Sequence, residues 1–357
     1  MRTYELVAKV LSSVHGVDKN PFAVVIARFR LMLAAMRAAG VDRLTQRLDF
    51  PINIAVGDSL LHGKGAPGRQ GEFDFGGEAT AWTYRIEDVN DYIKSCHILE
   101  FGTYHVVVAN PPYITVKDKA ENESIRARYE SCSGKYALSV PFAERIFGLA
   151  VLGTGYTGQI TSNSFMKREF GKKLIEQFFP KVDLTHIIDT SGAYIPGHGT
   201  PTVILIGRRR FTRSDSTVRA VLGIRGEPAQ PEDPARGSAW RAIVQQVDKP
   251  GSESEWVSVD DFVRGHFAEH PWSLSGGGAA DLSEILSRNS TAELQSHSSR
   301  LGVFGMTNAD DVMIAPFNAW NRRIGDDRWI RRLAVGDEIR DWKISDGEYV
   351  FFPLRSL

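Results

Sequence analysis

The sequence predicts an α/β protein with a doubly wound, mostly parallel sheet of the Rossmann-like type. Short apolar runs alternate with segments of helical periodicity from about Leu11 to Gly207, and such alternation places helices on both faces of a parallel sheet. Three polar side chains directly follow such runs, namely Asp18, Asp58 and Asn110. Because ligands bind beyond the carboxyl ends of parallel strands, these residues mark the expected ligand-binding edge.

Each expected element rests on a local pattern. Pro21 and Gly40 bracket a helix, because proline suits the first helical turn and glycine the position after the last. The β-branched run from Tyr104 to Ala109 predicts a strand buried on both faces. The full order is a strand over Leu11 to Val17, a helix from Phe22 to Gly40, a strand over Ile52 to Val56, a helix near Ile86 to Ile98, a strand over Tyr104 to Ala109, a helix over Leu138 to Leu152, a strand around Gln159 to Ser162, a helix from Phe165 to Phe178, and strands over His186 to Asp189 and Thr202 to Ile206.

A change in composition divides the chain into three parts. Beyond Arg210, the stretch from Gly226 to Gly237 is rich in proline, glycine and charged residues. We expect a first domain over residues 1–210, a linker or insert over residues 211–300, and the start of a further domain over residues 301–357.

The composition limits the classes of protein that fit. Lys plus Arg and Asp plus Glu both total 43, so the formal net charge is zero, which disfavours a uniformly basic protein that coats nucleic acid. No apolar stretch approaches the roughly 20 residues that a membrane-spanning helix needs. With Cys96 and Cys132 as the only cysteines, we expect neither a disulfide framework nor a metal site. We expect a cytoplasmic protein without membrane association.

Asn110, Pro111, Pro112 and Tyr113 follow the run that ends at Ala109 and suit the methylation of an amino group. The exocyclic amine of a nucleobase is a poor nucleophile, because its lone pair is delocalised into the ring. If the Asn110 side-chain oxygen and the Pro111 carbonyl both accept hydrogen bonds from the amine, its lone pair turns towards an electrophilic methyl group. The prolines hold these acceptors rigidly, and Tyr113 offers a flat face for a flipped base.

At these residues the sequence resembles the amino-methyltransferase superfamily, in particular the adenine-specific DNA methyltransferases with the unpermuted order of motifs. The resemblance covers Leu11 to about Arg210. Four segments resemble one branch most, namely Val14 to Pro21, Ala109 to Tyr113, Gln159 to Phe165 and Ser191 to Gly197. That branch comprises the PglX-like methylases of BREX-type phage-defence systems, which are relatives of the large fused restriction-modification enzymes.

The resemblance implies a Rossmann-like methyltransferase domain over residues 1–210 that uses S-adenosylmethionine and acts on double-stranded DNA, followed from residue 301 by the start of a target-recognition domain. In the family, an acid after the second strand binds the ribose of the cofactor, and Asp18 matches it. An acid after the third strand contacts the cofactor's adenine, and Asp58 with the adjacent Ser59 matches it. The resemblance also implies that Asn110 contacts cofactor and base. Tyr194 is the candidate for a second aromatic residue that stacks on the base, with Phe165 as the less favoured alternative.

One departure from the family pattern concerns the first cofactor motif. A strand ending in an Asp-Pro-x-x-Gly-x-Gly-like loop should precede Asp18, and only seventeen residues do so. The glycines between Gly153 and Gly158 follow a predicted helix, and we interpret them as a turn. We therefore expect a sheet without its first strand, in a chain shortened at its N-terminus.

Several assignments have alternatives. Asp18 and Asp58 also suit helix N-caps, a common role of aspartate at such turns. The arginines from Arg208 to Arg213 and from Arg322 to Arg332 suit contacts to DNA phosphates or a solvated surface. The Asn-Pro-Pro-Tyr pattern also occurs in enzymes that methylate RNA adenines or protein glutamines. A further alternative is an inactive module that binds DNA or other phage-defence proteins.

Overall fold

The computed structural model describes residues 3–43, 49–63, 87–197, 199–213 and 215–278, together with shorter stretches between residues 282 and 352. The chain divides into two compact units, Met1–Leu286 and Ser287–Leu357. Residues 301–309, where the third predicted part begins, lie outside the described residues. Among the residues described, none of the helices is both long and apolar enough to span a bilayer.

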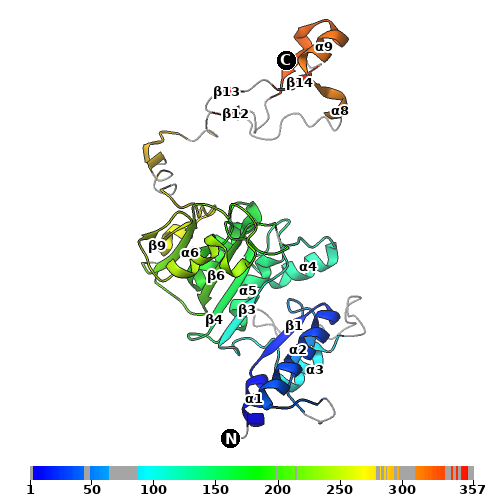
Figure 1. The fold of residues 1–357 in the computed structure, drawn as a ribbon, viewed down its shortest axis with the longest axis vertical. Helices are drawn as coiled ribbons and strands as arrows, with labels where there is room; N and C mark the ends of the chain where they lie inside the picture. Colours follow the sequence, from blue (N-terminus) through cyan, green and yellow to red (C-terminus); the bar gives the residue numbers. More distant parts are fainter. Residues whose placement is uncertain are drawn as a thin grey trace. The chain divides into compact units, whose positions relative to one another are not determined.

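A seven-stranded sheet forms the centre of the first unit (Figure 1). Its strands, in spatial order, are β3 (Val106–Ala109), β4 (Tyr156–Ser162), β6 (Thr202–Arg208), β5 (Asp183–Asp189), β7 (Thr217–Gly223), β9 (Val257–Val263) and β8 (Ser252–Glu253). The pairs β3–β4 and β5–β7 are parallel, whereas β6 is antiparallel to both of its neighbours and β9 to β7 and β8. The prediction of a mostly parallel sheet is wrong, because β5 returns as β6 through a loop without a crossover helix, which pairs them antiparallel.

A separate pair of parallel strands comes earlier in the chain, drawn in blue in Figure 1. β1 (His15–Asp18) pairs with β2 (Asn53–Val56), from His15 opposite Asn53 to Asp18 opposite Val56. α2 (Pro21–Ala39) and α3 (Val89–Cys96) contact this pair, and α1 (Thr3–Ser12) packs on α2. Gly40 ends α2 in the left-handed conformation with a φ of 71°, as the glycine stop predicts.

Side chains that alternate along the central strands form two cores, one on each face of the seven-stranded sheet. The accompanying helices are α4 (Lys119–Arg128), α5 (Ser139–Leu149) and α6 (Ser238–Gln246). α5 packs on the face that buries Ile187 of β5, and α6 packs on the face that buries the next residue, Ile188. A further cluster joins the strand pair to the larger sheet, because Val17 of β1 and Val107 of β3 pack against one group of buried residues that includes Val89 of α3.

Two strand predictions need correction. Leu11 and Ser12 end α1 instead of starting a strand, because Leu11 is buried against Ala35 and Met36 of α2. The strand predicted over Tyr104 to Ala109 is present as β3 but is not buried on both faces. Val106 and Val108 are 61% and 76% exposed, because β3 is the edge strand of the seven-stranded sheet.

The helix predicted from Phe165 to Phe178 is also wrong. Short 3-10 turns cover Asn163–Met166 and Glu169–Gly171, and a π-helical turn covers Leu174–Phe178. The chain folds back tightly here, since a Cβ atom on Gly171 would lie 1.9 Å from the Phe165 carbonyl oxygen. Only glycine fits this approach, and a continuous helix would not produce it.

The second unit is small and has its own apolar cluster. Its elements are α8 (Asp310–Met313), β10 (Ile314–Ala315), α9 (Phe317–Ile324), β11 (Ile330–Arg332), β12 (Ile339–Arg340), β13 (Lys343–Ile344) and β14 (Tyr349–Phe351). Trp320 is buried, and its indole N–H donates to the Tyr349 carbonyl at 2.9 Å. The compact units divide at Leu286, so β7, β8 and β9 belong with the first unit. The functional division into residues 1–210, 211–300 and 301–357 stays a prediction.

Candidate active site

Asp18 and Asp58 follow neighbouring parallel strands at the same edge. Asp18 is opposite Val56 in the β1–β2 pairing, and the Gly57 N–H donates to the Asp18 carbonyl at 3.0 Å. Asp58 is the second residue after β2. The topology therefore brings the two predicted acids together, as expected for the carboxyl ends of parallel strands.

The Asp18 side chain is exposed, and its Oδ1 accepts a hydrogen bond from the Asn20 N–H at 2.7 Å. Asn20, rather than Asp18, caps α2, because its Oδ1 accepts from the Phe22 N–H at 3.0 Å. The capping alternative for Asp18 is therefore wrong. A carboxylate has about four acceptor positions, so Asp18 keeps capacity for two hydroxyl donors.

The Asp58 side chain accepts more backbone hydrogen bonds from its own turn than the Asp18 side chain does. Its Oδ1 accepts from the Leu60 N–H at 2.9 Å and from the Leu61 N–H at 3.2 Å, which resembles a helix cap. Ser59 lies within this turn and is half-buried. Asp58 Oδ2 lies 3.4 Å from the Lys19 ammonium nitrogen. The carboxylate thus both holds the turn and carries part of an ion pair.

Lys19 links three elements of the edge, a role that the sequence pattern did not reveal. Besides Asp58, its ammonium donates to Glu121 Oε1 of α4 at 2.8 Å. Burial alone would lower the pKa of Lys19, but the hydrogen bond to Glu121 and the charges of Asp58 and Glu121 outweigh it, so this pKa is raised. The position next to Asp18 was the only sequence signal for Lys19, and Glu121 had none.

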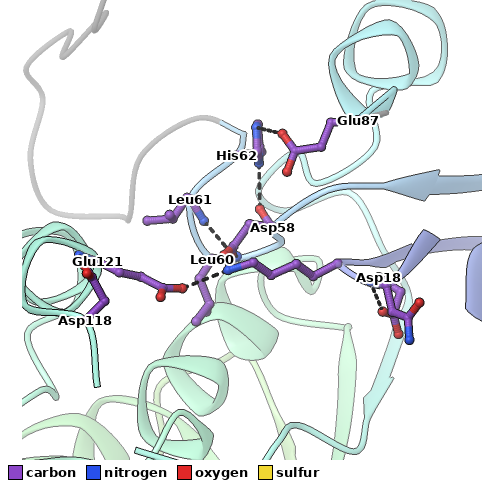
Figure 2. Close-up of polar contacts among 10 residues, drawn as sticks. Asp18, Asp58, Leu60, Leu61, His62, Glu87, Asp118 and Glu121 are labelled. Atoms are coloured by element: carbon purple, nitrogen blue, oxygen red, sulfur yellow. Dashed lines mark hydrogen bonds and ion pairs between the residues drawn. The ribbon is translucent and has the colours of Figure 1, made fainter. Parts of the chain in front are cut away.

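His62 and Glu87 extend the same edge, and sequence reasoning missed both. His62 Nδ1 lies 2.9 Å from the Asp58 carbonyl oxygen, which only accepts, so Nδ1 carries the hydrogen. His62 Nε2 faces Glu87 Oε2 at 3.7 Å (Figure 2). The Glu87 side chain is 4% exposed, its Oε2 has no hydrogen-bond partner in the described part of the chain, and burial raises its pKa. This oxygen is a spare acceptor beside Asp58.

Asn110 to Tyr113 form the loop directly after β3. Asn110 is exposed, Pro111 is buried and Pro112 is exposed, so the buried proline anchors the loop while the amide faces solvent. The Tyr113 hydroxyl donates to Asn110 Oδ1 at 2.9 Å, and burial raises the pKa of Tyr113. The oxygen that the sequence assigned to the target amine therefore already accepts one hydrogen bond.

Tyr194 lies in the loop between β5 and β6 at the same edge of the sheet. Ala109 pairs with Gln159 in parallel, and Ser162 pairs with Thr202, so the loops after β3, after β4 and before β6 leave the sheet on one side. Tyr194 is half-buried in the last of these loops. Gly153 lies in a turn before β4, as interpreted from the sequence, whereas Gly158 lies within β4 and pairs with Val108.

The arginines after β6 are engaged within the protein. Arg209 donates to the carbonyls of Gly148 and Ala150 at 2.7 and 3.0 Å. Arg210 pairs with the buried Asp183 at 2.6 Å, and Arg213 pairs with Asp215 at 3.0 Å. This cluster therefore supports the fold, and the phosphate role considered from the sequence has little support here.

β3 and the Asn110 loop lie within the part of the chain that matches the model of a restriction-modification methylase family. The chain belongs to the Eco57I restriction-modification methylase family, whose model matches residues 12–195. The chain is 50% identical, over 99% of its length, to the adenine-specific methyltransferase PglX of Streptomyces coelicolor. The chain spans 30% of the length of that relative. The predicted resemblance to PglX-like methylases is thereby confirmed.

Two solved structures with low sequence identity are similar in part. The methyltransferase subunit of a type I restriction-modification system from Streptococcus thermophilus is 12% identical, with a TM-score of 0.42 over 72% of this chain and 47% of that one. The type IIG restriction endonuclease BpuSI is 17% identical, with a TM-score of 0.38 over 67% of this chain and 30% of that one.

Proposed function

We propose that this chain carries the methyl-transfer site of a site-specific DNA adenine methyltransferase, within a cytoplasmic phage-defence or restriction-modification system. The observation that carries the proposal is the exposed Asn110 amide, which directly follows β3 and precedes the buried Pro111. Tyr113 lies beside it, and the carboxylates of Asp18 and Asp58 follow the two strands of the neighbouring pair. Family membership and the PglX relative support the same reaction class.

The Asn110 loop acts by orienting a weak nucleophile. Asn110 Oδ1 and the Pro111 carbonyl accept the two hydrogens of the adenine amine, which turns its nitrogen lone pair towards the methyl donor. Fixed acceptors of this kind lower the barrier because they need no reorganisation during the reaction. An amide oxygen has two lone pairs, so Asn110 can accept from the base while Tyr113 still donates to it.

Tyr113 both positions Asn110 and stacks on the target base. Its hydroxyl bond to Asn110 Oδ1 limits rotation of the amide. Its ring, beside the amide, offers a face for a flipped adenine, and Tyr194 is the proposed second stacking residue from the β5–β6 loop. Adenine stacked on Tyr113 would present its amine to Asn110 and Pro111.

The residues at the β1–β2 edge fit S-adenosylmethionine, which supplies an activated methyl group when bound. The spare Oε2 of Glu87 and the exposed carboxylate of Asp18 are acceptors, and the cofactor offers hydroxyl and amine donors. We assign Asp18 to the ribose hydroxyls, and Asp58 with Ser59 to the adenine end. Asn110, which follows β3, would also contact the cofactor.

We also propose that a further strand lies between β1 and β3. In the described ranges, β1 pairs only with β2, and β3 forms the edge of the larger sheet. The ring of His15 in β1 lies 5.4 Å from the ring of Tyr104, which precedes β3. Val17 and Val107 pack against one cluster, so β1 and β3 lie close together but do not pair. A parallel strand between them would satisfy both edges.

The decisive experiment uses the protein tagged and purified from its native locus, at whatever length the cell produces. The protein is incubated with tritiated S-adenosylmethionine and, in separate tubes, duplex DNA, RNA or cell protein. We expect label in N6-methyladenine of duplex DNA, and no label with the Asn110→Ala variant. Label confined to RNA or protein, or in cytosine, would overturn the choice of acceptor. Equal transfer by Asn110→Ala would overturn the site, and transfer by neither protein would favour a binding module.

A further inference from the structure

The loop that follows β4 carries a dense group of cations. Residues 167–173 contain four cations and one acid, Glu169, in a chain whose formal net charge is zero. The cations are Lys167, Arg168, Lys172 and Lys173. All four cationic side chains are exposed. None of them has an ion-pair partner within the described ranges, in contrast to Arg210 and Arg213. We call these four side chains the β4-loop cations.

The loop is rigid because apolar residues anchor it on both sides. Phe165 and Met166 before the cations, and Leu174 and Ile175 after them, are buried in the core of the seven-stranded sheet. The Trp272 N–H donates to the Met166 carbonyl at 2.9 Å. The backbone therefore presents the β4-loop cations from a fixed platform, which reduces the entropy lost when they bind a partner.

The loop leaves the sheet at the edge that carries the Asn110 loop. β3 and β4 are parallel, and Asn110 follows the residue paired with Gln159 of β4. β4 continues to Ser162, after which the loop begins. The β4-loop cations thus follow the strand next to the one that presents Asn110.

The charges of two β4-loop cations act on residues of other segments. Burial raises the pKa of Asp189, at the end of β5, and the Lys167 charge partly offsets this effect. Burial likewise raises the pKa of Cys132 to about 12, with a partial offset from Lys173. Cys132 lies between α4 and α5, downstream of Tyr113, whereas Asp189 precedes the Tyr194 loop.

We propose that Lys167, Arg168, Lys172 and Lys173 bind the phosphate backbone of duplex DNA next to the base that Asn110 receives. The proposal rests on the proposed function for the identity of the nucleic acid. The single acid in the loop, Glu169, leaves a net positive charge, and Lys181 nearby in the chain is already paired with Glu130 at 3.2 Å. Exposed cations without acidic partners on a rigid loop suit the regular spacing of phosphates.

The test measures binding of a fluorescein-labelled duplex of about 30 base pairs by anisotropy, without cofactor, from about 50 to about 200 mM KCl. In the test variant, Lys167, Arg168, Lys172 and Lys173 are all replaced by Gln. The control variant changes the same number of exposed cations on α1, α2 and α3, with Lys9, Arg30, Arg37 and Lys94 replaced by Gln. Thermal unfolding of both variants checks that they fold.

The slope of log K against log salt is negative, and each phosphate contact contributes about −0.9 to it. We therefore expect the slope of the test variant to be less negative by roughly 3 to 4. The control variant should change it by less than about 1. Equal effects of the two variants, no binding by the unchanged chain, or a clear preference for RNA would overturn the proposal. The assay contains no methyl donor, so failure of methyl transfer would refute the proposed function and leave this result interpretable.

Discussion

In the seven-stranded sheet, Ile187 and Val203 have no exposed surface, whereas beside the β1–β2 pair the α2 residues Phe22 and Val25 are 78% and 60% exposed. The larger sheet buries side chains on both faces under α5 and α6. The pair is covered by α2 and α3. It is linked to the rest by a shared cluster, by the Lys19 contact to Glu121, and by the loop after β2, where Leu60 packs against Tyr129.

The proposed base site and the proposed cofactor site follow strands of these two different regions. Asn110 follows β3, the edge strand of the larger sheet, while Asp18 and Asp58 follow the strands of the separate pair. Regions with fewer buried apolar contacts open with lower free energy. The core around β5 and β6 should therefore be the most rigid part of the first unit, and α2 beside the β1–β2 pair should open more easily.

The largest effect expected from this comparison is on stability. Ile187→Ala should lower the free energy of unfolding by about 2 to 5 kcal/mol, because it leaves a cavity in the larger core. Phe22→Ala should change it by less than about 0.5 kcal/mol, since that ring is mostly exposed. Urea unfolding followed by circular dichroism measures both. Equal losses of unfolding free energy in the two variants would contradict the difference in packing between the two regions.

A second prediction concerns the buried Glu144 of α5, whose Oε2 accepts from the Ser131 N–H and hydroxyl at 3.1 and 2.8 Å. Burial raises the pKa of Glu144 above its ordinary value of 4.5. Folding therefore disfavours the ionised form, so its destabilising effect is absent below pH 4.5 and grows as the pH rises through the raised pKa. Glu144→Gln keeps an oxygen acceptor and removes this titration.

The stability of Glu144→Gln relative to the unchanged chain should consequently increase from acidic to neutral pH. Urea unfolding of both proteins across this range measures the difference, in which the other titrating groups cancel. A difference that shrinks as the pH rises would show that ionised Glu144 is favoured by the fold.

The smallest expected effect is that of Lys19→Gln, which removes the link from Asp58 to Glu121. Because the Lys19 side chain is 48% exposed, the loss should stay below about 1 kcal/mol and should shrink in high salt. Amide exchange at Leu60 and Leu61 should become faster, since Asp58 holds their N–H groups. Lys119→Gln, at an exposed pair with Glu123, is the matched control. Equal exchange rates in both variants would contradict the link.

Local patterns predicted much of the fold, and long-range contacts explain the errors. The Gly40 stop and the loop from Asn110 to Tyr113 depend on neighbouring residues, so the sequence was sufficient for them. The antiparallel insertion of β6 and the edge position of β3 depend on strand order, which periodicity does not encode.

The site shows the same limit. The aspartates were visible because they follow apolar runs, and β1–β2 pairing brings them together. Lys19 and Glu121 are 102 positions apart, and His62 meets Glu87 only through the fold. The roles of Asp18, Asp58, Ser59, Asn110 and Tyr194 stay predictions.

The proposed function requires Asn110 for adenine methylation of DNA in the cell. The most direct measurement is single-molecule sequencing of genomic DNA from the source organism, with Asn110→Ala introduced at the native locus. We predict that N6-methyladenine at one recognition sequence disappears in this strain and persists in a strain with the surface change Lys94→Gln. Unchanged adenine methylation in the Asn110→Ala strain would contradict the account.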